Sequence, residues 1–178
     1  MKRLIVLTLA LLAGSAGVAG AAGIGLGAFA GMSFPVVQDD AAQGSMLGLR
    51  LPVSVVPLLT VEPYWASSAL GDKDVTINDV TYTREGFDTN AFGLNAMLTT
   101  GGPVQFYPFA GIGRTKLERP GNDASLTTYN AGFGVGFAPI PKLSVHVRGE
   151  FQMAVDGEAS RKFGNVTLGA SYALFSLP

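Results

Sequence analysis

The sequence contains no cysteine and only one histidine, and these two shortages exclude several kinds of site. Without cysteine, the chain cannot use the disulfides that stabilise many small secreted domains. One imidazole and no thiolate leave no recognisable zinc-binding set, and the acidic residues at 72–74 lack the spacing of a calcium loop. We therefore predict no metal or cofactor, and a stability that comes from a large core or a closed hydrogen-bonded network.

The sequence also lacks an excess of basic residues and, beyond its N-terminal region, a long apolar run. It holds 12 Lys and Arg against 13 Asp and Glu, which argues against a nucleic-acid partner. No stretch after Ala21 reaches the about 20 apolar residues that a transmembrane helix needs. A membrane-spanning structure would therefore have to be a β-barrel.

The N-terminal residues have the three parts of a secretory signal peptide. A basic start, Met1-Lys2-Arg3, precedes the apolar stretch 4–12, and Ala19-Gly20-Ala21 forms a small-residue cleavage site. The apolar stretch is too short for a membrane anchor. We expect residues 1–21 to be removed and residues 22–178 to form one outer-membrane β-barrel domain with a net charge of −3, because Lys2 and Arg3 are lost.

The stretch 142–155 alternates strictly between two kinds of side chain, which is the period of a β-strand. One face carries Leu143, Val145, Val147, Phe151, Met153 and Val155, and the other carries Ser144, His146, Arg148, Glu150, Gln152 and Ala154. In a soluble sheet the apolar face would point into the core. In a membrane barrel it would point into lipid and the polar face into the lumen.

Seven further segments alternate in the same way, so the chain offers eight strands. They span residues 24–34, 43–52, 58–67, 87–99, 104–117, 126–138, 142–155 and 163–175. The connections near 52–57, 99–103 and 139–142 are short and rich in Pro and Gly, whereas those near 39–40, 72–88, 116–123 and 156–162 are longer and charged. Short turns at one rim and long polar loops at the other are typical of outer-membrane barrels. The pattern predicts an all-β fold, an eight-stranded antiparallel up-and-down transmembrane β-barrel, with a small hairpin at 75–83 in its second long loop.

Two blocks carry a family resemblance. TTYNAGFGVGFAPIPKLSVHVRGEF and FYPFAGIGRTK resemble strands of the OmpA-like and opacity-type outer-membrane β-barrel family, and the similar layout covers residues 22–178. The resemblance implies a location in the bacterial outer membrane, in contact with its lipid, and concerns the barrel alone, without a peptidoglycan-binding domain. The final Phe175-Ser176-Leu177-Pro178 departs from the family, whose members commonly end on an aromatic residue.

The inward face of the predicted barrel carries ionisable residues, namely Arg50, Glu62, His146, Arg148 and Glu150. An eight-stranded barrel is just wide enough for side chains to fill its interior, and unpaired buried charges there are costly. The charges could therefore pair and plug the lumen. Alternatively, Glu62 could exchange between Arg50 and Arg148 as a gate that admits water, small ions or solutes.

Aromatic residues near the predicted strand ends are candidates for the two interfacial girdles of a membrane barrel. We expect Trp65, Phe87, Tyr129, Phe137 and Tyr172 to contact the membrane interfaces.

We expect a monomeric structural or narrow-pore protein. Three alternatives stay open: an adhesin or ligand-binding protein acting through its long extracellular loops, a soluble secreted lipocalin-like binder with its faces reversed, and a lipid-modifying enzyme. Ser144 and His146 share a face, as an esterase would need, but the alternation directs His146 into the lumen, away from lipid. We therefore predict no catalytic residues and no enzymatic activity.

Overall fold

The computed structural model describes residues 23–36, 41–100, 102–119, 121–157 and 159–176. The signal peptide expected at residues 1–21 lies outside this described part. The strands are β1 (Gly23–Val36), β2 (Gly44–Arg50), β3 (Val53–Val56), β4 (Leu59–Leu70), β5 (Lys73–Ile77), β6 (Val80–Arg84), β7 (Asp88–Leu98), β8 (Val104–Arg119), β9 (Asn122–Ile140), β10 (Leu143–Asp156) and β11 (Ala159–Ser176). No helix that could cross a membrane occurs among the described residues.

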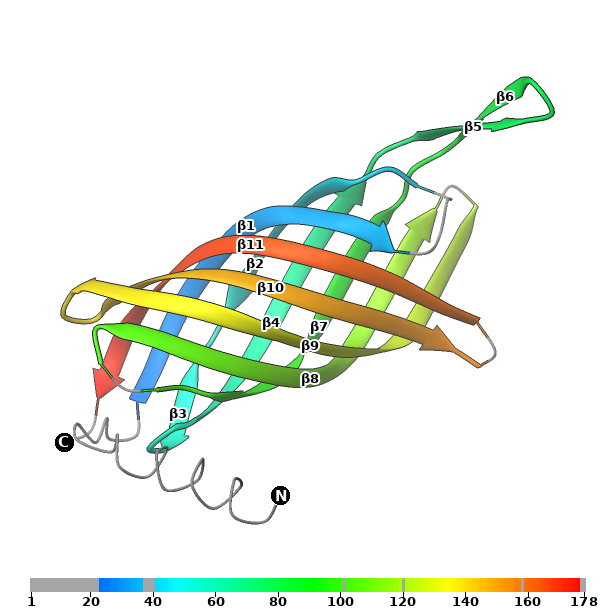
Figure 1. The fold of residues 1–178 in the computed structure, drawn as a ribbon. Coiled ribbons are helices and arrows are strands. Elements are labelled where there is room, and N and C mark those ends of the chain that lie inside the picture. Colours follow the sequence, from blue (N-terminus) through cyan, green and yellow to red (C-terminus); the bar gives the residue numbers. More distant parts are fainter. Residues whose placement is uncertain (1–22, 37–40, 101, 120, 158, 177–178) are drawn as a thin grey trace, which may run out of the picture.

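The strands form one antiparallel wall that closes on itself (Figure 1). Each wall strand pairs with the next along the chain, and β1 pairs with β11 from Gly23 opposite Ser176 to Val36 opposite Lys162. β2 and β3 both lie between β1 and β4, so together they make one wall strand. The predicted eight-stranded antiparallel up-and-down barrel is confirmed.

The second wall strand is interrupted at Pro52, which has no backbone N–H to donate to a ladder. Backbone hydrogen bonds still connect this region to both neighbouring strands. Leu51 N donates to Pro63 O at 2.9 Å, and Gly25 N donates to Pro52 O at 2.8 Å. The expected short link at 52–57 is therefore wrong, since four of its residues form β3. The chain turns at Pro57 and Leu58, where Leu58 has a φ of 73°.

At the opposite rim, two of the four expected charged loops are continuations of strands. The β8–β9 ladder reaches Glu118 opposite Asp123, and the β10–β11 ladder reaches beyond Val155 opposite Ser160. The strands extend because inward residues such as Leu117 remain buried at this level, while the outward charges pair across the strands. Lys116 Nζ lies 3.0 Å from Glu118 and 2.9 Å from Asp123.

The second connection at this rim does contain the predicted hairpin. β5 and β6 pair from Lys73 opposite Arg84 to Ile77 opposite Val80, and their two-stranded sheet is separate from the barrel wall. Asn78 and Asp79 have φ values of 51° and 63°, as a type I′ turn requires. The hairpin projects beyond the barrel at the end opposite the start of β1 and the end of β11 (Figure 1).

The barrel is apolar outside and polar inside. Outward side chains along the wall are about half exposed, including Leu26, Leu47, Phe92, Leu94, Ile112, Phe133, Val147, Val166 and Leu168. The inward Arg50, Glu62 and Arg148 are at most 6% exposed. A soluble lipocalin-like barrel needs the reverse arrangement, so that alternative does not fit the structure. The exposed apolar band is the surface that a membrane barrel presents to lipid.

Candidate functional site

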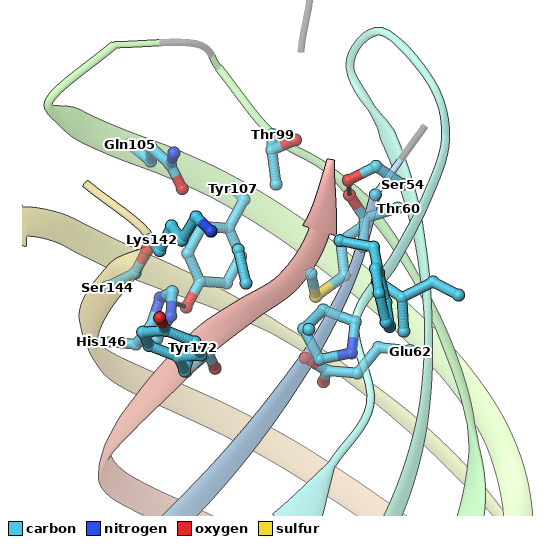
Figure 2. Close-up of a pocket in the computed structure, with 18 of the residues that line it drawn as sticks. Ser54, Thr60, Glu62, Thr99, Gln105, Tyr107, Lys142, Ser144, His146 and Tyr172 are labelled. Atoms are coloured by element: carbon cyan, nitrogen blue, oxygen red, sulfur yellow. Dashed lines mark hydrogen bonds between the residues drawn. The ribbon is translucent and has the colours of Figure 1, made fainter. Parts of the chain in front are cut away.

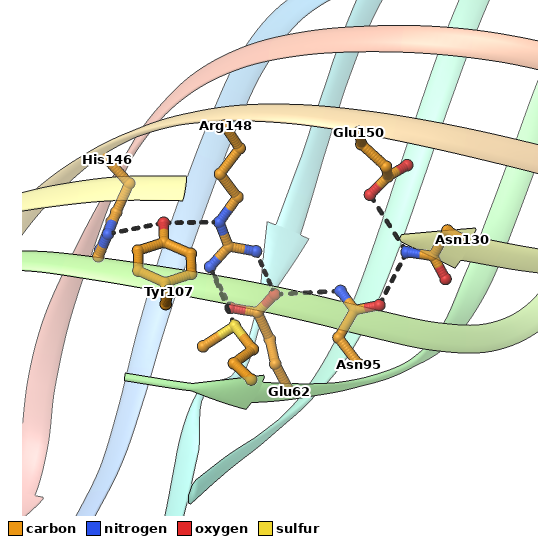
Figure 3. Close-up of polar contacts among 8 residues, drawn as sticks. Glu62, Asn95, Tyr107, Asn130, His146, Arg148 and Glu150 are labelled. Carbon is orange, nitrogen blue, oxygen red and sulfur yellow. Dashed lines mark hydrogen bonds and ion pairs between the residues drawn. The ribbon is translucent and has the colours of Figure 1, made fainter. Parts of the chain in front are cut away.

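A buried ion pair crosses the middle of the lumen (Figure 3). Arg148 on β10 binds Glu62 on β4 through two parallel hydrogen bonds, from Nη1 to Oε1 at 2.5 Å and from Nη2 to Oε2 at 2.8 Å. Its Nε donates to the Tyr107 hydroxyl of β8 at 2.9 Å. Three strands that are distant in sequence thus fix one guanidinium, and the pair is a charge-assisted, bidentate contact.

The second lumenal carboxylate, Glu150, is held by amides rather than by an arginine. Asn165 Nδ2 donates to Glu150 Oε1 at 2.9 Å and Asn130 Nδ2 donates to Oε2 at 3.2 Å. Asn130 also donates to Asn95 Oδ1 at 2.8 Å, and Asn95 donates to Glu62 Oε1 at 3.3 Å. A continuous row of hydrogen bonds therefore joins the two carboxylates (Figure 3).

The remaining lumenal arginine, Arg50, lies over the Phe29 ring, with its Cζ 4.3 Å from the ring centroid. Its Nε and Nη1 are buried and make no hydrogen bond. The structure thus places all five predicted ionisable residues inside the barrel, but brings only Glu62 and Arg148 into an ion pair. His146 instead contacts the Tyr107 hydroxyl through Nδ1, at 3.2 Å. No group of three or more Asp, Glu or His side chains within the described ranges is arranged to hold a metal ion.

Tyr107 is central to this layer, although the crowded Phe-Tyr-Pro-Phe stretch shows no clear alternation from which its orientation could be predicted. Tyr107 lies opposite Gly134 in the β8–β9 ladder, and Phe109 lies opposite Gly132. A Cβ atom on Gly134 would overlap the Tyr107 ring, so the glycine provides the space in which the ring lies across the lumen. The glycines at alternate positions of β9 were the available signal that large rings face them.

An apolar cluster lies inside the barrel at the hairpin-side end. Its members are Ala41, Leu70, Phe87, Leu117, Leu126, Ala154 and Phe163. The rings of Phe87 and Phe163 meet edge to face, 6.5 Å apart, and the Arg119 guanidinium lies 4.5 Å from the Phe87 ring centroid. Phe87 is only 3% exposed, so the prediction that it belongs to an interfacial girdle is wrong. It shares the alternation of the buried Thr89 and Ala91, which directs it inward.

The other four predicted interfacial aromatics lie on the outer wall. Trp65, Tyr129, Phe137 and Tyr172 are each 40–53% exposed. Their contact with membrane interfaces stays a prediction.

Two cavities flank the Glu62–Arg148 pair, and both residues line each of them. On the hairpin side lies a space of about 30 Å³ next to Arg50 and Glu150. On the other side, towards the start of β1 and the end of β11, lies an open cavity of about 330 Å³, which we call the cup (Figure 2). The ion pair therefore separates a water-sized space from a ligand-sized one.

Searches with the sequence find no matching protein-family model and no matching curated protein. Solved structures do match. Neisserial surface protein A has a TM-score of 0.64 at 13% identity, covering 84% of this chain and 96% of that one. A major outer membrane protein from Thermus thermophilus has a TM-score of 0.61 at 13% identity, covering 86% of this chain and 100% of that one.

The attachment invasion locus protein Ail of Yersinia pestis, solved in complex with the heparin analogue sucrose octasulfate, matches with a TM-score of 0.54 at 16% identity. This match covers 86% of the present chain and 99% of Ail. These likenesses concern the fold. The chain therefore has the fold of the OmpA-like, eight-stranded outer-membrane β-barrels, as its sequence predicted.

Proposed function

We propose that this chain is a structural protein of the bacterial outer membrane whose lumen is closed to solutes. The observation that carries the proposal is a pair of barriers in series. The first is the bidentate Glu62–Arg148 pair, and the second is the apolar cluster around Phe87 and Phe163. An ion that crossed the barrel would have to break a buried ion pair and then enter an apolar constriction, and both steps are costly.

Single-channel recording in planar bilayers tests this proposal. The wild type is expected to show no unitary current. Glu62→Gln/Arg148→Met, which removes the charges while keeping bulk, is expected to stay silent because the apolar cluster remains. Adding Phe87→Ala and Phe163→Ala is expected to open a path. Steady current through the wild-type protein would overturn the proposal.

A gated narrow pore is the second candidate, and the state of Arg50 favours it. Its Nε and Nη1 lack hydrogen bonds, and it lines the small cavity together with Glu62 and Glu150. A carboxylate that left Arg148 would therefore find a second guanidinium nearby. If the wild type conducts intermittently, Arg50→Gln is expected to reduce the open fraction and Arg148→Ala to raise it. The control is Arg114→Gln on the outer wall, where the charge change does not reach the lumen.

An extracellular binding role is the third candidate, favoured by the projecting hairpin. Ile77, Val80 and Tyr82 are each about half exposed on β5 and β6, and Val75 pairs with Tyr82. Ail, which has this fold, is described in complex with a heparin analogue. Replacing residues 73–84 by a short Gly-Asn turn is expected to keep the barrel intact and to abolish binding of cells to an external surface. Unchanged adhesion would count against this role.

We further propose that residues 1–21 direct export and are then removed. The mature protein is expected to begin at Ala22, which intact-mass measurement of protein from the membrane fraction checks. A mass that included residues 1–21 would contradict the cleavage.

A further inference from the structure

The cup is open at its mouth and bounded at its inner end by hydrogen-bonded side chains, which is the shape of a binding cavity. Its inner end is formed by Glu62, Arg148 and Tyr107, which are joined by hydrogen bonds. Its mouth lies where β1 begins and β11 ends, at the short-turn rim (Figure 2). The volume of about 330 Å³ falls within the range of small-molecule sites.

The charges that line the cup leave it positive. Glu62 is the one carboxylate among the described lining residues, and both of its oxygens accept hydrogen bonds from Arg148. Lys142 also lines the cup, in the turn between β9 and β10, and the ion pairs among the described residues do not include it. Its positive φ of 72° holds it in the tight turn at the mouth.

The deeper donor is His146. The Tyr107 oxygen already accepts a hydrogen bond from Arg148 Nε, so its own proton is available to His146 Nδ1 at 3.2 Å. When Nδ1 accepts, the imidazole proton lies on Nε2, which becomes a donor. His146 lines the cup and is 9% exposed. Lys142 at the mouth and His146 further in therefore supply donors at two depths.

Hydroxyl and amide groups complete the lining. They belong to Ser54, Thr60, Thr99, Gln105, Ser144 and Ser171. Such groups both donate and accept, and so match the hydroxyls of a ligand. We propose that the cup binds a small polyhydroxylated anion of sugar-acid size, with its carboxylate near Lys142 and His146 and its hydroxyls against the serine and threonine side chains. Binding requires only the folded barrel, whereas access from the periplasm rests on the proposed outer-membrane orientation.

The only histidine of the chain gives the experiment a single reporter inside the cup. The folded full barrel, in uncharged polyoxyethylene micelles that carry no sugar, is titrated with gluconate while the His146 ring signals are followed by NMR. Gluconate is expected to shift them saturably. Glucose has the hydroxyls without the charge, so it loses one charge-assisted contact. Inorganic phosphate has the charge without the carbon-bound hydroxyls, so it loses several neutral contacts. Each is expected to bind at least about five-fold more weakly than gluconate.

Lys142→Gln is expected to weaken gluconate binding about five-fold, and Lys142→Arg to retain it. Lys116→Gln, which removes the same charge at the opposite rim, is the matched control and is expected to bind as the wild type does. The absence of a saturable shift would overturn the inference, and so would equal affinity for glucose or phosphate, or an unaffected Lys142→Gln protein. Bilayer current through the wild type would refute the closed lumen but would leave the binding result unchanged.

Discussion

The buried ion pair between Arg148 and Glu62 predicts that losing one partner costs more stability than losing both. Arg148→Ala would leave the Glu62 carboxylate buried without its bidentate donor, and breaking such a pair costs about 3–5 kcal/mol. We expect this loss in the free energy of unfolding, measured by urea titration with the heat-modifiable gel shift of barrels as the readout. The double variant Glu62→Gln/Arg148→Met removes both charges. Its free energy of unfolding is expected to fall clearly less than that of Arg148→Ala. Equal losses for the two variants would contradict the ion-pair explanation.

Gly134 determines where Tyr107 lies. Gly134→Val would place a branched side chain against the Tyr107 ring, so the ring must leave its position. We expect about 1–3 kcal/mol of destabilisation, which is typical of overpacking, and a changed His146 NMR signal because the Tyr107–His146 contact is lost. Gly149→Val is the matched control, since a Cβ atom on Gly149 meets nothing within 4 Å. An unmoved His146 signal in Gly134→Val would refute this role.

At the scale of elements, the β5–β6 hairpin differs from the wall. It pairs only with itself among the described strands, and isolated two-stranded hairpins are marginally stable in water. We expect its amides to exchange with deuterium within seconds to minutes, while those of β8 to β10 stay protected for hours. Hydrogen–deuterium exchange by mass spectrometry checks this. If the amides of residues 73–84 were as strongly protected from exchange as those of β9, the prediction of a marginally stable hairpin would be wrong.

The strands themselves were largely predictable, because a period of two is visible without tertiary information. The orientation of Arg50, Glu62 and the β10 residues followed from the alternation alone. Strand ends were not predictable in the same way. Charged residues such as Lys116 and Asp123 resemble a loop in sequence, whereas their pairing across two extended strands exists only in the folded ladder.

The partners within the lumen depend on the register of distant strands, which the sequence does not display. Both arginines face inward, yet only Arg148 forms an ion pair with Glu62, while Arg50 lies over Phe29. Phe87 was misplaced for a related reason. Its place near a strand end predicts an interfacial position, but the alternation of β7 already applies to Phe87, one residue before the strand begins, and directs the ring into the apolar cluster.

For the whole molecule, the decisive property is that apolar side chains lie on the outside of the barrel and polar ones on the inside. A substitution at Leu168 tests it. Leu168 lies near the middle of β11 and is 59% exposed on the outer wall. If that wall faces hydrocarbon, Leu168→Arg places a charge near the bilayer centre and should destabilise the barrel by about 2–4 kcal/mol in lipid. Ser125→Arg, also outward but close to the hairpin-side rim, should cost at most about 1 kcal/mol.

Urea unfolding in lipid vesicles measures the stability loss of both variants. Because a water-facing wall would tolerate both arginines equally, equal stabilities would refute the membrane-embedded barrel, and a larger loss at position 168 would locate the hydrocarbon.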